Sequence, residues 1–143
     1  MSSSSTLCVD ASLVIRLVLK QSDVVQELWE NWASEEYRLA APALLYYEVT
    51  NGIYRYQKAG LIRPATAQEA LGTALALPVE LVRGPDLHER ARKLATQYNL
   101  SAAYDAHYLA LAEWMDAEFW TADSRLVNTL KPHKLAWVKG IDV

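Results

Sequence analysis

Short apolar strands alternate with helices along almost the entire chain of 143 residues. Apolar and β-branched residues gather in short runs at 6–9, 39–41, 79–82, 118–121 and 135–138, where we expect strands. Between these runs, apolar residues recur at helical spacing, which predicts helices over 10–18, 22–32, 42–59, 64–77, 86–98, 102–115 and 123–130. Strands that are separated by helices pair in parallel. The chain is therefore predicted to form an α/β domain of three α/β/α layers with a central, mainly parallel sheet.

The chain is long enough for one domain to bury a core without disulfides or a structural metal. We expect a disordered, serine-rich tail over residues 1–5 and a single domain over residues 6–143. The tail lacks the pattern of a signal peptide, and the apolar run at 13–19 falls well short of the roughly 20 residues that span a membrane. The one cysteine, Cys8, allows no disulfide framework, which predicts a cytoplasmic protein without membrane contact.

Acidic residues follow two of the expected strands. Asp10 comes directly after the first strand, Asp123 follows the fourth, and Asp105 stands near the expected start of a helix. Each has an ordinary alternative role, because an aspartate at a helix start caps free backbone amides. Capping does not require two acids to leave separate strands at the same sheet edge, where open α/β sheets bind ligands. Several carboxylates that meet there predict a site for a hard cation such as Mg²⁺.

Glu48 lies on the apolar face of an expected helix, where Leu44 and Leu45 are its neighbours at helical spacing. A glutamate is costly to bury in such surroundings unless it is paired or bound to a cation. The alternative to a metal ligand is an ion pair with a base such as Arg16 or Arg55.

The remaining polar residues give weaker indications. His88, His107 and His133 show no metal-ligand spacing, which argues against a zinc site. Ser12 and Thr121 are placed either to hydrogen-bond a neighbouring carboxylate or metal-bound water, or to cap local backbone.

The net charge of −3 and the pI near 5.6 argue against a protein that coats nucleic acid through a general positive potential. Cations bound by clustered acids would nevertheless reverse the local field.

Four segments carry a resemblance to a known family. They are Val-Asp-Ala-Ser at 9–12, Pro-Ala-Leu-Leu-Tyr-Tyr-Glu-Val-Thr-Asn at 42–51, Tyr-Asp-Ala-His-Tyr-Leu-Ala-Leu-Ala at 104–112 and Thr-Ala-Asp at 121–123. In this order and at this spacing they resemble the PIN-domain ribonucleases, and among them the VapC-type toxins of toxin–antitoxin pairs. The resemblance covers nearly the whole chain, and the combination of motifs is specific.

The resemblance implies a three-layer PIN-like fold and an endoribonuclease that hydrolyses RNA phosphodiester bonds with Mg²⁺ or Mn²⁺. It maps metal binding onto Asp10 and Asp105, and it makes Glu48 and Asp123 the third and fourth acids. Thr121 matches a small hydroxyl residue beside the fourth acid. Because no second acid follows Asp123 closely, a direct role in metal binding and a role through water both stay open for it.

The resemblance also implies partners. It predicts a homodimer, an RNA substrate and a cognate antitoxin protein that covers the acidic groove. The apolar and aromatic helices expected at 22–33 and 42–59 are candidate surfaces for the protein contacts.

Two other functions fit part of the pattern. A PIN-like domain could bind RNA or a protein without cutting. A receiver-like phosphoacceptor also places acids at strand ends around Mg²⁺, but it normally has paired acids after its first strand. Here Asp10 is followed by Ala11 and Ser12, which disfavours that reading.

Overall fold

The computed structural model describes residues 5–141 of the chain. Within them, five strands form one sheet in the order β3-β2-β1-β4-β5, and every pair of neighbouring strands is parallel. The strands are β1 (Thr6–Val9), β2 (Arg38–Pro42), β3 (Val79–Val82), β4 (Glu118–Thr121) and β5 (Val138–Gly140). The predicted α/β fold with a parallel central sheet is confirmed. Apart from Ser5, the tail predicted over residues 1–5 lies outside the described residues.

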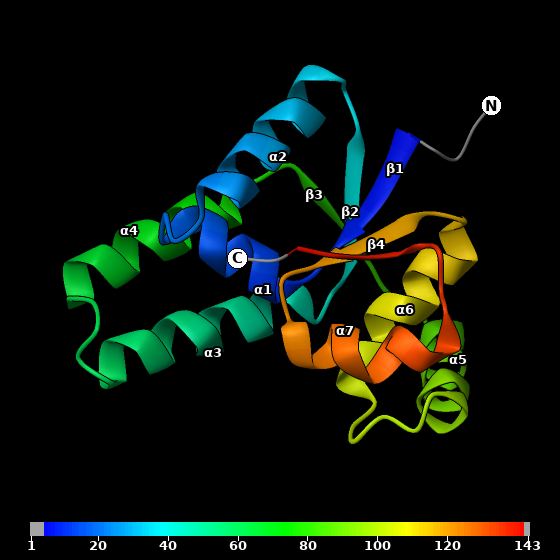
Figure 1. Ribbon diagram of the computed structural model, residues 1–143. Coiled ribbons are helices and arrows are strands. Elements are labelled where there is room, and N and C mark those ends of the chain that lie inside the picture. Colours follow the sequence, from blue (N-terminus) through cyan, green and yellow to red (C-terminus); the bar gives the residue numbers. More distant parts are fainter. Residues whose placement is uncertain (1–4, 142–143) are drawn as a thin grey trace.

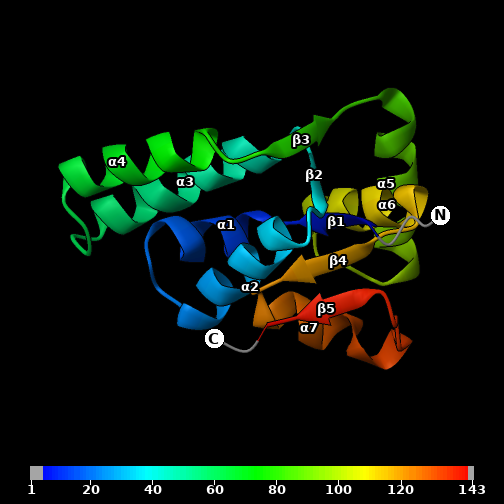
Figure 2. The same ribbon diagram turned by 90° about the horizontal axis from the view of Figure 1, so that it is seen from above.

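The helices form two layers, one on each side of the sheet (Figures 1 and 2). The helices α1 to α4 lie on one side, and α5 to α7 lie on the other. Their bounds are α1 (Ala11–Val18), α2 (Asp23–Ser34), α3 (Leu45–Lys58), α4 (Pro64–Leu75), α5 (Pro85–Gln97), α6 (Tyr104–Met115) and α7 (Ser124–Leu130), followed by a 3₁₀ turn at Lys131–His133. Within residues 5–141, no helix has the length and apolar character to cross a membrane.

The core lies around the central strand. Every residue of β1 is buried, as expected for a parallel strand that helices cover on both faces. The helix α6 buries a continuous run from Tyr108 to Ala112 against this region, whereas the edge strand β3 is mostly half-buried. The alanines of α6 at 106, 110 and 112 are fully buried, and the helix contacts β1, β2 and β4, so the helix that carries Asp105 is packed against the sheet.

Helices α3 and α4 lie side by side and project from the rest of the molecule (Figures 1 and 2). The hydroxyl of Tyr46 on α3 donates a hydrogen bond of 2.9 Å to the carbonyl of Ala74 on α4. At the base of this pair, α3 packs on α1 at Gly52, where an added Cβ would lie 2.3 Å from Cδ1 of Ile15. The glycine therefore leaves room for the end of the Ile15 side chain between the two helices.

The predicted starts of one helix, α3, and one strand, β5, each lie three residues before the observed ones. Pro42 ends β2 instead of opening the next helix, because Pro42 pairs with Val82 and the amide of Ala43 continues the ladder to the Val82 carbonyl at 3.1 Å. The last strand is Val138–Gly140, and the apolar run that begins at Leu135 forms a turn instead, closed by a hydrogen bond of 3.2 Å from the Val138 amide to the Leu135 carbonyl. This turn follows Lys134, which has a left-handed backbone conformation.

The order of the strands also separates two of the functions considered above. Receiver domains have the strand order 2-1-3-4-5. Here β1 lies in the centre of the sheet between β2 and β4. This order is incompatible with a receiver-like phosphoacceptor.

Candidate active site

Adjacent strands deliver two of the predicted acids to the same edge of the sheet. The strands β1 and β4 are hydrogen-bonded neighbours, with Val9 level with Trp120. Asp10 leaves β1 and caps α1, and its side chain accepts a hydrogen bond from the Leu13 amide. Asp123 follows β4 and caps α7 in the same way. The predicted capping roles are confirmed for both residues, and both caps lie at the carboxyl ends of neighbouring strands.

The carboxylate of Asp10 is held by hydroxyl groups from both strand ends. Ser12 Oγ donates to Asp10 Oδ1 at 2.6 Å, and Thr121 Oγ1 donates to Oδ2 at 2.5 Å. Each hydroxyl in turn accepts a backbone N–H, from Ala122 at 2.9 Å and from Asp123 at 3.0 Å respectively. Because a hydroxyl has one proton, these bonds direct both protons to Asp10.

This arrangement leaves Asp10 with unused capacity. A carboxylate offers about four lone-pair positions, and three are filled by Ser12, Thr121 and the Leu13 amide. Asp10 is only 6% exposed, and burial raises its pKa to about 6 in spite of these hydrogen bonds, with a further contribution from the charge of Asp123. The remaining lone pair can take a cation, which would favour the ionised carboxylate.

Asp105 lies in the first turn of α6 and is half-buried. It does not cap the helix, because the cap position is Ala103 and carries no side-chain hydrogen bond. Burial raises the pKa of the Asp105 carboxyl, the negative charge of Asp123 raises it further, and Arg125 opposes both. Within residues 5–141 its carboxylate accepts no hydrogen bond and makes no ion pair.

Glu48 reaches the same region from α3. Its Oε1 accepts a hydrogen bond of 2.5 Å from the hydroxyl of Tyr108, which is buried on α6. The ion pair with Arg16 or Arg55, considered as an alternative from the sequence, is absent among the described residues. Burial raises the pKa of Glu48, and the charge of Asp105 adds to this effect.

Electrostatic interactions connect all four acids. Asp123 acts on both Asp10 and Asp105, and Asp105 acts on Glu48. None of the four makes an ion pair within residues 5–141.

The sequence analysis did not identify Tyr108 as a residue of the site. Its pKa is raised by burial and by the charges of Glu48, Asp10 and Asp105. The sequence did contain one indication of this role: Tyr108 follows Asp105 by three residues on the same helix, which places the two side chains next to each other.

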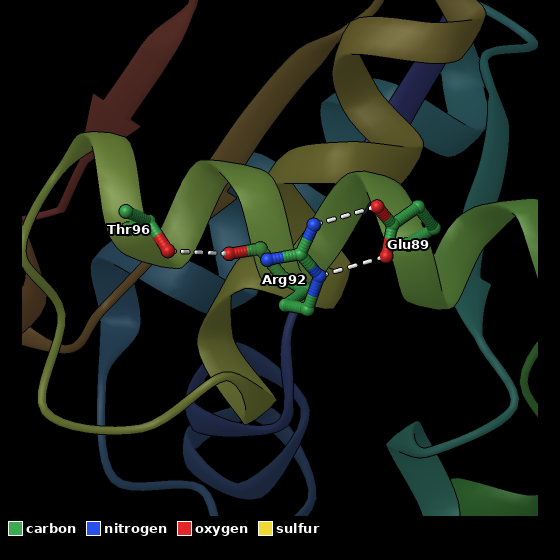
Figure 3. A network of polar contacts seen from close by, with 3 residues as sticks. All are labelled: Glu89, Arg92 and Thr96. Carbon is green, nitrogen blue, oxygen red and sulfur yellow. Dashed lines mark hydrogen bonds and ion pairs between the residues drawn. The ribbon is translucent and has the colours of Figure 1, made fainter.

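Glu89 on α5 differs from the four site acids because it is paired with a base. Glu89 accepts hydrogen bonds of 2.8 and 2.7 Å from the guanidinium of Arg92 (Figure 3). One turn later on the same helix, the hydroxyl of Thr96 donates to the Arg92 carbonyl. The hydrogen bond from the Arg92 guanidinium lowers the pKa of Glu89. The four site acids lack such a partner, and three of them have raised pKa values. A bound cation would compensate their charge.

The chemistry of these side chains fits Mg²⁺ or Mn²⁺. All candidate ligands are carboxylate oxygens, which hard cations prefer, and no histidine or cysteine takes part. Within residues 5–141 no group of three or more acidic, histidine or cysteine side chains is close enough to form a complete metal-binding group. Mg²⁺ does not require one, because it is usually held by one or two carboxylates and keeps several waters.

Two histidines meet outside the acidic cluster. His88 Nδ1 and His107 Nε2 are 2.9 Å apart across α5 and α6, and His107 Nδ1 lies 2.7 Å from the Ala103 carbonyl. His107 is thus on a different face of α6 from Asp105, as the sequence spacing predicts.

A cavity of about 490 Å³ lies at the other end of the sheet, where Thr6, Tyr37 and Trp137 line it together with other residues. None of the four acids lines that cavity.

Comparisons with known proteins agree with the fold and the motifs. The sequence profile of the PIN domain matches residues 7–131. Ribonuclease VapC9 of Mycobacterium tuberculosis is 34% identical over 123 residues, which are 86% of this chain and 90% of that protein. Ribonuclease VapC3 of Pyrobaculum aerophilum is 29% identical over 127 residues, with coverage of 85% and 92%.

Solved structures resemble the chain in fold. The crystal structure of PAE2754 from Pyrobaculum aerophilum has a TM-score of 0.70 at 23% identity and covers 98% of this chain and 85% of that chain. VapBC2 from Rickettsia felis, bound to a DNA fragment from their promoter, also has a TM-score of 0.70, at 14% identity with coverage of 96% and 99%. At such identities the likeness concerns the fold alone.

Proposed function

This chain belongs to the PIN domain family, and from that membership we propose that it is a divalent-metal-dependent endoribonuclease and the toxin of a toxin–antitoxin pair. The observation that carries the proposal is the meeting of Asp10, Glu48, Asp105 and Asp123 beside one sheet edge, without a base paired to any of them in the described part of the chain. Relatives over most of the length are named ribonucleases, which supports the same reaction.

In this proposal, Asp10 and Asp105 hold Mg²⁺ or Mn²⁺, and Glu48 and Asp123 take part directly or through water. Asp10 has a free lone pair, and the oxygens of Asp105 have no hydrogen-bonding partner within residues 5–141. When bound, the cation neutralises charge on the phosphate and lowers the pKa of a coordinated water. Ser12 and Thr121 keep the Asp10 carboxylate in one orientation.

The proposed reaction is hydrolysis. Water adds to phosphorus, the bond from phosphorus to one ribose oxygen breaks, and that oxygen leaves with a proton. Three hydroxyls are hydrogen-bonded to the site acids: those of Ser12 and Thr121 donate to Asp10, and that of Tyr108 donates to Glu48. They are thus positioned to orient a carboxylate, and the proposal includes no covalent intermediate on the protein.

We further propose that the chain binds a cognate antitoxin and forms a homodimer. The projecting pair of helices α3 and α4 offers a surface, because Tyr47 and Tyr54 on α3 are 77% and 53% exposed. Large exposed aromatic residues are typical of protein interfaces. The similarity in fold to VapBC2 of Rickettsia felis supports an antitoxin partner.

We also propose that the protein is cytoplasmic, because Cys8 is a buried free thiol, as expected in a reducing compartment.

Cleavage of labelled single-stranded and structured RNA, with Mg²⁺, Mn²⁺ or EDTA, tests the nuclease. The proposal predicts cutting that requires the metal and is lost in Asp10→Asn. Asp23→Asn is the matched control, because Asp23 is an exposed acid on α2 with no part in the cluster. Retained RNA binding without cutting by the metal-loaded wild type would instead favour a non-catalytic PIN-like binder.

A further inference from the structure

Tyr108 connects the two helices that carry Glu48 and Asp105. Its side chain is 1% exposed, and its ring packs against Phe119 of β4 with ring centroids 6.0 Å apart. The ring packing fixes where the hydroxyl lies. From there, the hydroxyl donates a hydrogen bond of 2.5 Å to Glu48 Oε1, across 60 positions of sequence.

Tyr108 and Asp105 share one face of α6. They are three residues apart, so their side chains are neighbours on the helix surface. The electrostatic interaction between Asp105 and Glu48 shows that the glutamate meets this same face. A glutamate has a flexible side chain, and only one of its oxygens is taken by the tyrosine. Within residues 5–141, Oε2 of Glu48 has no hydrogen-bonding partner.

We propose that Tyr108 is a positioning residue for the metal site: its hydroxyl fixes the Glu48 carboxylate beside Asp105 and leaves Oε2 for a divalent cation or its water. This inference rests on the proposed function. It assigns Tyr108 a role through Glu48, without contact to the cation or the RNA. Groups that orient a metal ligand typically change metal affinity or activity by about 10- to 100-fold when they are removed.

Tyr108→Phe isolates the hydroxyl, because phenylalanine keeps the ring against Phe119. Calorimetric titration with Mn²⁺ is expected to show affinity about 10-fold weaker than in the wild type. In RNA cleavage, we expect kcat to fall by about 10-fold or more while KM for RNA changes little. Mn²⁺ affinity is a readout that a role in packing alone would not change.

Tyr46→Phe is the matched control. It also removes a tyrosine hydroxyl that bonds across two helices, but the partner is the Ala74 carbonyl and no site acid is involved. We expect Tyr46→Phe to bind Mn²⁺ like the wild type. If Tyr108→Phe also binds Mn²⁺ like the wild type, whereas Glu48→Gln binds it more weakly, the positioning role is overturned and the metal site stands. A wild type that binds no Mn²⁺ and cuts no RNA would overturn the proposed function together with this inference.

A double variant tests whether Tyr108 acts through Glu48 and covers the case in which Tyr108→Phe does not fold. Glu48→Gln combined with Tyr108→Phe removes both the charge of Glu48 and the hydroxyl that donates to it. Removing both partners of a buried hydrogen bond usually lowers stability less than removing one and leaving the other without a partner. The proposal predicts that the double variant and Glu48→Gln alone have the same Mn²⁺ affinity. A further loss of affinity in the double variant would contradict it.

Discussion

The hydroxyl of Thr121, the last residue of β4, donates a hydrogen bond of 2.5 Å to the carboxylate of Asp10, the first residue after β1. This bond ties two neighbouring strands at the point where the site begins. Thr121 is fully buried, so neither partner has water as a replacement. The orientation of Asp10 is therefore set by the sheet itself.

Thr121→Val tests this bond, because valine has nearly the same shape and lacks the hydroxyl. Leaving the buried Asp10 oxygen and the Asp123 amide without a partner is expected to lower the free energy of unfolding by about 1–3 kcal/mol. Urea unfolding measures this change. Thr129→Val is the control, since its exposed hydroxyl bonds only to the Arg125 carbonyl one turn earlier in α7. An equal effect of both substitutions would mean that the Asp10 bond has no special importance.

The acidic site should make stability depend on pH in the absence of metal. The pKa of Asp10 is raised from 3.8 to about 6 in the folded protein, so the folded state holds this proton more tightly than the unfolded chain. The resulting stabilisation is present below pH 3.8 and is lost as the pH rises through about 6. The loss is roughly 3 kcal/mol for a shift of this size.

Urea unfolding in EDTA between pH 4 and pH 7 measures this effect as the difference between wild type and Asp10→Asn. We expect the wild type to lose stability relative to the variant across this interval. A difference that stays constant with pH would show that Asp10 titrates in the folded protein as it does in the unfolded chain.

Divalent cations should stabilise the fold through the same acids. At a Mn²⁺ concentration 100 times the dissociation constant, binding adds about 2.7 kcal/mol to the free energy of unfolding. EDTA should reverse the gain, and Asp105→Asn should show much less of it. Thermal unfolding with and without Mn²⁺ measures the change. A gain in Asp105→Asn as large as in the wild type would place the cation elsewhere.

Two glycines in the helices of the projecting pair should respond differently to substitution by alanine. In Gly52→Ala, the new Cβ would lie 2.3 Å from Cδ1, the end of the Ile15 side chain, so Ile15 must change its side-chain conformation at a cost of about 0.5–1.5 kcal/mol, which offsets the gain in helix propensity. In Gly72→Ala on α4, nothing lies within 4 Å, and the better helix propensity of alanine should stabilise by up to about 1 kcal/mol. Similar stability for the two variants would contradict this account of the packing.

Much of the fold follows from local patterns in the sequence. The strands Thr6–Val9, Val79–Val82 and Glu118–Thr121 were predicted with the bounds that the structure has. Each is a short run rich in apolar residues between turn residues, and β1, in the centre of the sheet, is buried throughout. The prediction at 135–138 was wrong because the residues after Lys134, which has a left-handed backbone conformation, form a turn closed by the bond from the Val138 amide to the Leu135 carbonyl, so that the strand begins only at Val138.

The candidate site was predictable to the extent that it depends on strand ends. Asp10 and Asp123 reach the same edge of the sheet, which follows from parallel pairing, whereas the adjacency of their strands β1 and β4 is known only from the structure. The Tyr108 bond to Glu48 was not predictable, because it depends on how α3 and α6, which lie on opposite sides of the sheet, are placed relative to each other, and this is decided by packing between distant segments. The meeting of His88 with His107 has the same origin.

Crystals grown with Mn²⁺ test the central claim most directly, because anomalous scattering locates the cation without reference to activity. The account predicts an anomalous peak beside the carboxylates of Asp10 and Asp105, with Glu48 and Asp123 bound directly or through water. The peak should be absent in Asp10→Asn crystals under the same conditions. A Mn²⁺ peak elsewhere in the protein, with none beside these acids at saturating Mn²⁺, would contradict the assignment of the metal site.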